Sequence, residues 1–194
     1  RKRKNKYELA EFCLLVCECF GYSELKKLRS AEAAGKSNLL YGHNLFSGLY
    51  LNELLYRLLK PYDAHPRLFS YYHTIVEQLG LNDSADGVWL EVLLRRFEVV
   101  LLEELGYGLP LLNEAQSDTP ISASKQYYFD VQHGFHRIAP LPNQASFAGG
   151  DLLAIAADDY SEARVRKTAK RLMRQALAPL LGNKPLRSRS LFKR

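Results

Sequence analysis

Apolar side chains recur at helical spacing in the central part of the chain, where they predict three helices. Across residues 45–59 leucines return every three or four positions, and Pro61 then ends the run. A second helix is expected over residues 66–79, because it opens with a proline and is followed by Gly80. The third, over residues 87–105, is apolar on nearly every side, which places it at the centre of a bundle.

The N-terminal segment has a different pattern, which favours strands. Residues 9–20 are short, apolar and rich in Cys, Val and Phe, residues 23–33 are of mixed polarity, and Gly21 and Tyr22 mark a turn between them. Two strands cannot bury a core by themselves, and the later sequence supplies no further strands for them. We therefore expect that the first part of a β-domain is missing from this chain.

The later part of the chain predicts a hairpin. Polar residues 113–124 are typical of a loop. Aromatic residues then fill 125–138 on both sides of His133 and Gly134, which favours a small β-hairpin with its turn at that pair.

Two more helices are expected after the hairpin. A short one falls near residues 151–157, and a longer one spans residues 162–181. Ser161 is a suitable N-cap for the longer helix, Pro179 should bend its last turn, and Gly182 should end it.

Charge is segregated along the chain. Residues 1–6 carry five positive charges, residues 164–194 carry eleven, and neither segment has an acid, whereas residues 7–163 hold all 21 acids and 11 bases. Cationic ends on an acidic middle favour a polyanion held at defined places, and nucleic acid is the commonest, because each neutralised phosphate releases a counterion. A solvated basic tail is the alternative.

The longest C-terminal helix is basic and amphipathic. Its cations fall at spacings of three and four, so they share one face opposite an apolar one; they are Arg164, Lys167, Lys170, Arg171 and Arg174. Such a helix suits a membrane, calmodulin or nucleic acid. Because it lacks aromatic membrane anchors, phosphate contact is the better interpretation, with a plain solvated face as the alternative.

Arg95 and Arg96 interrupt the most apolar helix of the chain. One interpretation is an intramolecular ion pair with Glu91 or Glu98, which lie at suitable helical spacing. The other is a cationic rim on an apolar groove, suited to an acidic peptide with a hydrophobic end. The sequence leaves both open.

The sequence shows no catalytic or metal-binding constellation. P-loop, G-x-G-x-x-G and G-x-S-x-G patterns are absent, so we argue against an enzyme. Asp130, His133 and His136 have a ligand-like spacing, but three residues put the two histidines on opposite faces of a strand. Asp158 and Asp159 are expected simply to face water.

Three cysteines, at 13, 17 and 19, share one face of the first expected strand. They lack a fourth ligand for zinc, so Cys13, Cys17 and Cys19 are expected to be buried thiols in a reducing compartment. The length of 194 residues suits one large domain or two small ones. No apolar run approaches the ~20 residues needed to span a bilayer, and no secretory signal is visible.

Five stretches of the sequence form a recognisable set. They are ELKKLRSAEA (24–33), LFSGLYLNELLYRLL (45–59), HPRLFSYY (65–72), LRRFEVVLLEELGYG (94–108) and KRLMRQALAPLLGNKPLRSRSLF (170–192). The most specific parts are LYLNELL, the RRFE…LGYG helix and the GxKPLxSRxLF ending. In order and spacing these stretches resemble the bacterial recombination mediator RecO family over almost the whole chain.

The resemblance implies a fold, which is α+β and mostly α. Residues 1–36 would be the C-terminal part of an OB-fold barrel whose first strands are absent. Residues 37–194 would be an α-helical bundle with a small β-hairpin insert. Some members carry a four-cysteine zinc site after LGYG, but no cysteine follows that motif here. We therefore predict no metal or other cofactor, and a hairpin core of Tyr127, Phe129 and Phe135.

The resemblance also implies a role in DNA repair. RecO-like proteins bind single- and double-stranded DNA, anneal complementary strands, and work with RecR to load RecA onto DNA coated by single-stranded DNA-binding protein (SSB). They dock the acidic, Phe-ended SSB tail on the helical domain. This implies a non-enzymatic bacterial protein of the cytoplasm and nucleoid, with no membrane partner. A peptide-recognition module and an RNA- or ribosome-associated basic protein are the alternatives.

The residue matches assign candidate sites. Arg95 is the first candidate for the tail carboxylates and Arg96 the second. DNA contact is expected from the N-terminal basic loop, from the following strand and from the basic helix. The DNA candidates are Arg1, Lys2, Arg3, Lys4, Lys6, Lys26, Lys27, Arg29, Lys167, Lys170, Arg171 and Arg174.

Overall fold

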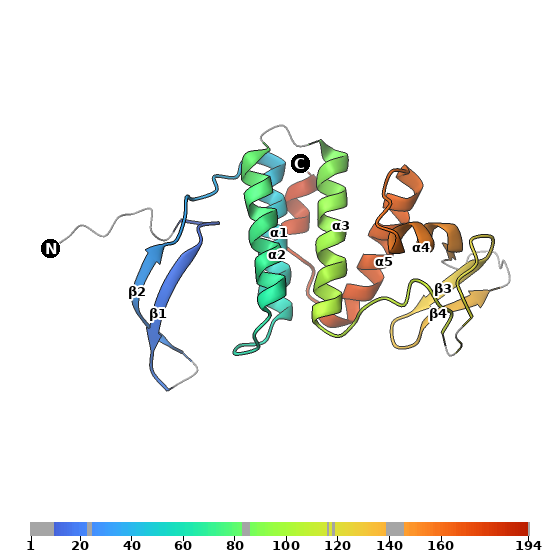
Figure 1. Ribbon diagram of the computed structural model, residues 1–194, viewed down its shortest axis with the longest axis horizontal. Helices are drawn as coiled ribbons and strands as arrows, with labels where there is room; N and C mark the ends of the chain where they lie inside the picture. Colours follow the sequence, from blue (N-terminus) through green and yellow to red (C-terminus); the bar gives the residue numbers. More distant parts are fainter. Residues whose placement is uncertain are drawn as a thin grey trace.

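Helices and two small sheets build the chain in the order that the sequence predicts (Figure 1). The computed structural model describes residues 10–22, 25–82, 86–115, 117, 119–138 and 146–193. The α+β class is confirmed, and in the described part no helix is long and apolar enough to cross a membrane. The elements are β1 (Leu15–Phe20), β2 (Lys27–Ala33), α1 (Gly42–Leu58), α2 (Pro66–Leu81), α3 (Gly87–Glu104), β3 (Gln126–Asp130), β4 (Gly134–Ile138), β5 (Phe147–Ala148), α4 (Gly149–Ala156), α5 (Ala163–Leu181) and the 3₁₀ helix η1 (Ser188–Lys193).

The central position predicted for the third helix is confirmed. α3 packs against α1, α2 and α5, and eight of its side chains are buried. Phe97 and Leu101 have no exposed surface, and neither has Leu54 of α1 or Leu172 of α5. Burial of each such side chain contributes about 1.5–3 kcal/mol to stability. The packing of the other helices against α3 is therefore a main source of the stability of the bundle.

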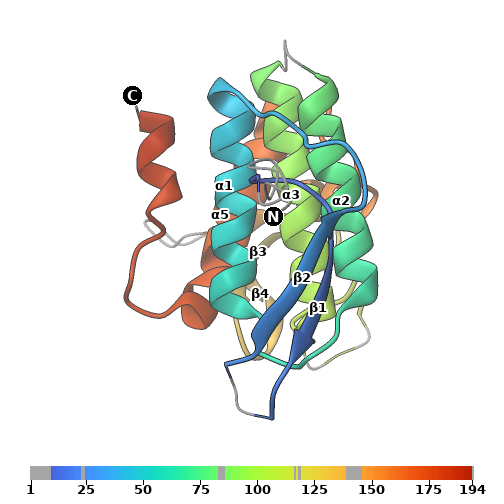
Figure 2. The same ribbon diagram turned by 90° about the vertical axis from the view of Figure 1, so that its left-hand side faces the viewer.

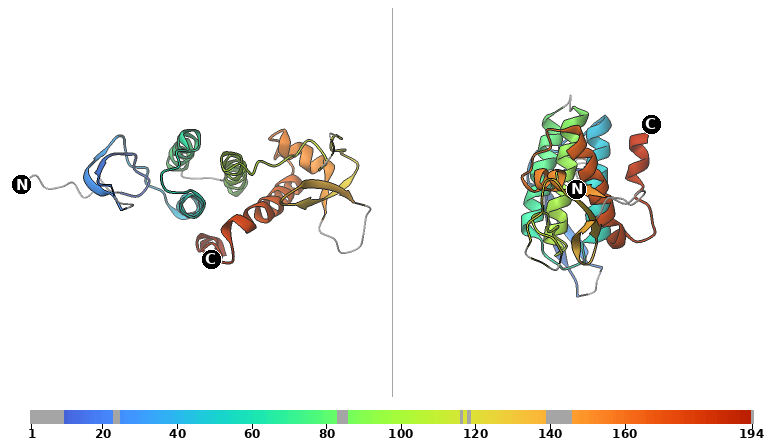
Figure 3. Two further views of the ribbon diagram at one scale, coloured as in Figure 1. Left: turned by 90° about the horizontal axis from the view of Figure 1, so that it is seen from below. Right: turned by 90° about the vertical axis from the view of Figure 1, so that its right-hand side faces the viewer.

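The helical bundle lies between two β elements. Figures 1 and 3 show the β1–β2 hairpin at one end of the molecule and the β3–β4 sheet with α4 at the other. In Figure 2 the β1–β2 hairpin runs across α1 and α2, with its tip beside the loop that joins them. The chain thus presents two separate surfaces, one at the hairpin and one where α4 meets α2 and α3.

The hairpin expected near residues 125–138 is confirmed, with a third strand added. β3 pairs antiparallel with β4, so that Tyr128 faces His136, and β5 joins the other edge of β3. The expected aromatic core is also confirmed: Tyr127, Phe129 and Phe135 are buried, together with Phe147 of β5. β5 was not predicted, because two residues carry no recognisable periodicity.

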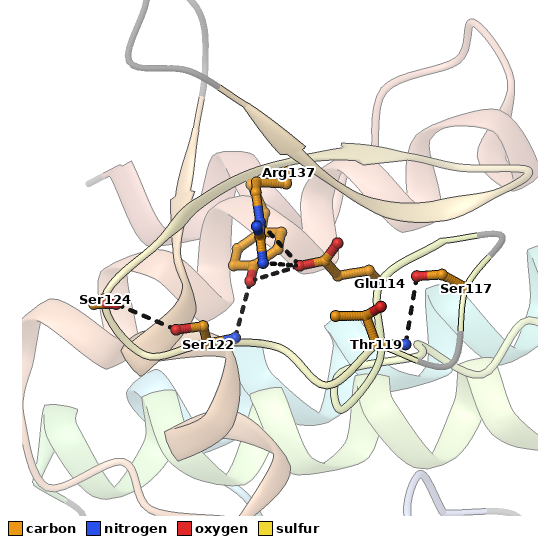
Figure 4. A network of polar contacts seen from close by, with 7 residues as sticks. Glu114, Ser117, Thr119, Ser122, Ser124 and Arg137 are labelled. Atoms are coloured by element: carbon orange, nitrogen blue, oxygen red, sulfur yellow. Dashed lines mark hydrogen bonds and ion pairs between the residues drawn. The ribbon is translucent and has the colours of Figure 1, made fainter.

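Polar contacts complete this sheet (Figure 4). Glu114 accepts hydrogen bonds from the Tyr127 hydroxyl at 3.2 Å and from Arg137 Nε at 3.1 Å. The Tyr127 oxygen in turn accepts the Ser122 backbone N–H at 2.9 Å. These contacts satisfy buried polar atoms where the loop before β3 crosses the sheet.

The N-terminal hairpin departs from one expectation. β1 and β2 pair antiparallel with a register shift between Glu18 and Cys19, and Gly21 turns the chain with φ of 114°. Cys17 and Cys19 are exposed and Cys13 is partly buried, so the expectation of three buried thiols is wrong. Within the described residues, the strand face that carries Cys17 and Cys19 packs against no second layer.

The start of α5 also differs from the expectation. The helix begins at Ala163, with Glu162 in the N-cap position and no side-chain cap. Ser161 is therefore not the cap. The Ser161 backbone N–H donates to the Asp159 carboxylate at 3.0 Å, so Ser161 belongs to a turn that precedes the helix. The N-cap position falls one residue later, at Glu162. Pro179 lies inside α5, which continues to Leu181.

Candidate peptide and nucleic-acid interfaces

A groove opens where α2, α3 and α4 meet. Its volume is about 390 Å³, and its walls combine apolar and aromatic side chains with two arginines. The lining residues are Arg67, Tyr71, Arg96, Val99, Val100, Ile155, Ala156, Asp158 and Tyr160. An apolar floor beside cations suits a ligand that is partly hydrophobic and partly anionic.

Arg96 forms the polar side of this groove. Its Nε donates to the Asp158 carboxylate at 2.8 Å, and this bond raises the pKa of the guanidinium. Nearly half of the Arg96 side chain remains exposed. Asp158 is exposed, as the sequence predicts, but it does not simply face water, because its carboxylate is the ion-pair partner of Arg96.

Aromatic residues form the apolar side. Tyr71 stacks on the buried Phe97, with ring centroids 6.4 Å apart and an interplanar angle of 10°. Burial raises the pKa of the Tyr160 hydroxyl to about 12 and also raises that of Tyr71. Both phenols therefore stay neutral at physiological pH and can act as hydrogen-bond donors to an anion.

Arg95 does not line the groove but forms an intramolecular ion pair, which was the first of the two alternatives. It is buried, and its Nη1 lies 2.9 Å from Oε2 of Glu98, so the intramolecular ion pair is confirmed for this arginine. Glu98 also accepts a hydrogen bond from the Tyr50 hydroxyl of α1. Glu91 instead lies near Arg166 and Lys170 of α5, each at 3.8 Å.

The cations of α5 divide into two groups. Arg164 pairs with Asp151 of α4 and with Glu162, and Lys170 pairs with Glu91. Their charge is thus partly neutralised by the fold, which the helical spacing alone could not reveal. The Arg164–Glu162 pair is exposed and contributes little to stability, whereas the Asp151 carboxylate is buried.

The second group keeps its charge for solvent. Arg171 donates to the Ser146 backbone oxygen and lies 4.3 Å from the centroid of the Phe147 ring, a cation–π contact that needs no acid. Lys167 and Arg174 are exposed and make no ion pair with any described residue. These three cations are the part of α5 that can meet phosphates.

The N-terminal candidates lie on the β1–β2 hairpin or before it. Arg1, Lys2, Arg3, Lys4 and Lys6 fall outside the described residues. Lys27 is exposed, whereas Arg29 pairs with Glu18 at 3.0 Å. Lys26 donates to the Gly21 carbonyl at 2.7 Å, and its Nζ lies 5.4 Å from the centroid of the Tyr62 ring, a contact that sequence reasoning missed.

Asp130, His133 and His136, which have a ligand-like spacing in the sequence, are arranged differently in the β3–β4 hairpin. His133 lies in the turn, where its Nδ1 is 2.8 Å from the Asp130 carboxylate. The His136 ring stacks on Tyr128 and lies 6.4 Å from the His133 ring, so the expectation of opposite strand faces is wrong, because His133 precedes the strand. Over the described ranges, no group of three or more potential ligands could hold a metal ion.

Comparison with known proteins agrees with the resemblance. The family model described as Recombination protein O C terminal matches residues 41–190. Proteins named DNA repair protein RecO are similar over most of the chain. The one from Cellvibrio japonicus is 42% identical over 193 residues, covering 98% of this chain and 79% of that protein. The one from Pseudomonas aeruginosa is 45% identical over 181 residues, covering 93% and 75%.

Proposed function

Because the chain belongs to the RecO family and thus to the DNA repair proteins, we propose that it is a non-enzymatic mediator of repair and recombination. It binds single- and double-stranded DNA, anneals complementary strands and, with RecR, helps to load RecA onto SSB-coated single strands. The observation that carries this proposal is the family match over residues 41–190. The proposed place of action is the bacterial cytoplasm, at the nucleoid.

The proposed domain division follows the same family. Residues 1–36 form the later part of an OB-fold, and residues 37–194 form the helical domain. Two observations support the division. β1 and β2 turn a face with Cys17, Cys19 and Leu28 outward, and more than half of Leu28 is exposed, as expected of a barrel interior without its other strands. The matched family region begins after this hairpin, at residue 41.

For the SSB tail, the groove between α2, α3 and α4 is the proposed site. The tail is acidic and ends in phenylalanine, so it needs cations beside an apolar pocket, and this groove combines the two. Arg96 is the proposed carboxylate ligand, in exchange for Asp158. Arg95 is the weaker candidate for direct contact, because it is buried and paired with Glu98, and its proposed role is to hold α3 in place.

For DNA, the proposed ligands are the basic N-terminal loop, Lys26 and Lys27 of the hairpin, and the exposed cations of α5. Cations that hold two strands screen their mutual repulsion, which is the physical requirement for annealing. Binding of this kind weakens steeply with salt and does not depend on sequence. Lys167 and Arg174 support the α5 contribution, because both are exposed and neither forms an ion pair with an acid among the described residues.

One titration tests the recruitment step. A labelled SSB C-terminal peptide is titrated with wild-type protein, with Arg96→Ala and with Lys167→Ala, an exposed cation outside the groove, and the anisotropy is read. We expect the peptide affinity to fall about tenfold in Arg96→Ala and to stay unchanged in Lys167→Ala. Equal binding by all three proteins would move the tail site elsewhere.

The same three proteins are then titrated with a labelled single strand. Arg96→Ala should keep full DNA affinity. In Lys167→Ala the negative slope of log K against log salt should become shallower by about 0.7, because one phosphate contact is lost. A wild type that binds the peptide but no DNA would instead be the peptide-recognition module. A wild type that prefers RNA and ignores the peptide would be the ribosome-associated alternative.

A further inference from the structure

The C-terminal segment, residues 182–193, is basic but is attached to the fold. The Glu53 carboxylate of α1 accepts the backbone N–H groups of Arg187 and Ser188, each at 2.9 Å. Farther along, the Phe192 ring packs against aromatic side chains of α1. The described part of this basic end therefore has a fixed path along α1.

This attachment leaves the cations of the segment available. Glu53 uses its carboxylate oxygens for backbone groups and for the Ser188 hydroxyl, and not for a lysine or an arginine of the segment. Lys184 and Arg187 are exposed, and neither makes an ion pair with a described residue. Their charges are thus held at fixed places and can meet an anionic partner.

The segment begins beside the end of α5. Arg57 donates to the carbonyl of Leu181, where α5 ends, and Glu53, one turn earlier on α1, holds Arg187. These two attachment points are about 6 Å apart along the α1 axis. Figure 3 shows α5 and η1 along the same side of the bundle. The segment and α5 are therefore neighbours in space as well as in sequence.

A buried carboxyl places cations of both elements near one point. Burial raises the pKa of Glu98 in α3, and Arg95, Arg189 of η1 and Arg174 of α5 act against this rise. Charges have this effect on a carboxyl from a few ångströms away. Arg174 and Arg189 therefore lie near the same carboxyl, although they belong to different elements.

The result is a surface with two rows of cations. One row follows α5 and consists of Lys167, Arg171 and Arg174, and the other follows the C-terminal segment with Lys184 and Arg187. Duplex DNA presents two phosphate backbones at a fixed separation, whereas a single strand presents one. The charge of a duplex along its axis is about twice that of one strand. Two fixed rows of cations therefore suit a duplex.

The aromatic rings of this surface do not favour a single strand. Proteins that hold single strands offer aromatic faces on which bases stack. Here Phe147 is buried, with Arg171 over its ring, and Phe192 stacks on His43. These rings are used within the fold, so phosphate contact is what the surface offers.

We propose that α5 and the C-terminal segment together bind double-stranded DNA, with α5 on one phosphate backbone and with Lys184 and Arg187 on the other. This inference rests on the proposed DNA binding and adds the strand type and two ligands. A single strand needs only the ligands already proposed, so Lys184 and Arg187 serve the duplex alone.

The first test measures the anisotropy of a labelled duplex and of a labelled single strand of the same length at several salt concentrations. In Lys184→Ala and in Arg187→Ala, the negative slope of log K against log salt should become shallower by about 0.9 for the duplex, because one phosphate contact is lost. Both variants should bind the single strand as wild type does.

Lys36→Ala is the matched control for the loss of one charge. Lys36 is also exposed and makes no ion pair with a described residue, but it precedes α1. The 17 residues of α1, about 25 Å in length, separate it from the end of the helix where Arg57 holds α5. Lys36→Ala should leave the salt dependence of duplex binding unchanged.

A second variant distinguishes a fixed surface from a loose basic tail. Glu53→Ala removes a negative charge, so a loose tail would bind the duplex more tightly in this variant. A segment that must be fixed on α1 should instead bind it about threefold or more weakly, because binding must then order the segment. Glu77→Ala removes an acid of α2 that pairs with His73, and it should not weaken duplex binding. Circular dichroism confirms that each variant keeps its helices.

The outcomes separate this inference from the proposed function. An unchanged duplex slope in both Lys184→Ala and Arg187→Ala refutes the inference while DNA binding stands. Equal losses for duplex and single strand refute the assignment of these residues to the duplex. Equal or tighter duplex binding by Glu53→Ala refutes the fixed surface. A wild type that binds the single strand but no duplex refutes the inference alone, and one that binds neither removes the proposed DNA binding as well.

Discussion

Arg95 and Glu98 lie one turn apart on α3 and form an ion pair inside the helical bundle, with 2.9 Å between Nη1 and Oε2. The Glu98 side chain is 1% exposed and that of Arg95 is 7% exposed. Nε of Arg95 has no hydrogen-bond partner in the described part of the chain. Because burial removes the hydration of both charges, each depends on the other, and their separate replacement has a larger effect than their joint replacement.

Replacing Arg95 with methionine should destabilise the fold strongly. The variant leaves the Glu98 carboxylate buried without its cation, and we expect a loss of about 3–5 kcal/mol in the free energy of unfolding, measured in urea. The double variant Arg95→Met/Glu98→Leu is the control and should recover most of this loss. A single variant within about 1 kcal/mol of wild type would show that the pair is not needed.

The same carboxyl makes stability depend on pH. Burial raises the pKa of Glu98 above its ordinary value of 4.5, although Arg95 and the Tyr50 hydroxyl act against this. The folded state then holds the proton more strongly than the unfolded state. The protonated Glu98 carboxyl should therefore stabilise the folded state at low pH. This stabilisation should be lost as the pH rises from about the ordinary pKa of 4.5 through the raised pKa of the folded state. Urea titrations across this pH range give the free energies of unfolding of wild type and Glu98→Gln. The difference between the two free energies should become smaller at low pH.

Asp158 competes with the proposed ligand of the groove. Its carboxylate holds Arg96 at 2.8 Å, and both side chains are about half exposed. Asp158→Asn should free the guanidinium and tighten binding of the SSB-tail peptide by up to about fivefold. Asp159→Asn is the control, because that carboxylate lies in the turn with Ser161 and not in the groove. Weaker peptide binding by Asp158→Asn would mean that Asp158 positions Arg96 for the ligand.

Two adjacent glycines at the start of α4 should respond differently to alanine. A Cβ on Gly149 would lie well inside contact distance of the Ser122 backbone oxygen, whereas one on Gly150 would meet Ala123 at an ordinary 3.6 Å. We expect Gly149→Ala to cost about 1–3 kcal/mol and to lower Tm by several degrees, because backbone must move. Gly150→Ala should have little effect in the same thermal melt. Equal melting of the two variants would contradict the close approach.

Glu53 should hold the C-terminal segment on α1. Its carboxylate accepts the backbone N–H of Arg187 and that of Ser188, each at 2.9 Å, and the Ser188 hydroxyl at 2.6 Å. These bonds outweigh the effect of burial and lower the pKa of Glu53. Glu53→Ala should therefore speed tryptic cleavage after Arg187 and Arg189, read by mass spectrometry.

The control for this release is Glu77→Ala, which removes an exposed acid of α2 that contacts only His73 among the described ion-pair partners. Its cleavage pattern should match that of wild type. Since the pKa of Glu53 is lowered, its stabilisation is present above the ordinary value of 4.5 and is lost as pH falls through the lowered one. Phe192 of η1 also packs its ring near His43 and Phe46 of α1, with centroids 6.4 and 6.0 Å away. An unchanged cleavage rate in Glu53→Ala would show that these ring contacts hold η1 without Glu53.

The helices could be predicted because their signal is local. Leucine spacing and Pro61 located α1 and its end, and the all-round apolar pattern correctly placed α3 at the centre. The first turn of α1, from Gly42, was missed, because its residues carry no apolar repeat. The start of α4 at Gly149 and the 3₁₀ helix η1 were also not predicted. Ser161 was assigned as a cap because residue type alone cannot show which residue turns into the helix.

The site could be predicted in part. The sequence offered a buried ion pair and a groove rim as alternatives for two adjacent arginines, and each alternative holds for one of them: Arg95 is buried with Glu98, and Arg96 lines the groove. The groove itself was out of reach, because Ile155 and Tyr160 meet Tyr71 only through tertiary packing. The exposure of Cys17 and Cys19 likewise depends on whether another layer packs against their face of the strand. The local sequence pattern does not contain this information.

The attachment of η1 to α1 affects the order in which the protein can be completed during synthesis. Glu53 and Ser188 are 135 residues apart in sequence, and Arg57 reaches the Leu181 carbonyl across 124 residues. Contacts of such span close late, since the intervening chain must first be ordered. On the ribosome, α1 emerges long before η1, so the part of its surface that η1 covers stays uncovered while α2 to α5 are translated. The newly made chain is thus most exposed to aggregation and proteolysis until η1 has left the ribosome.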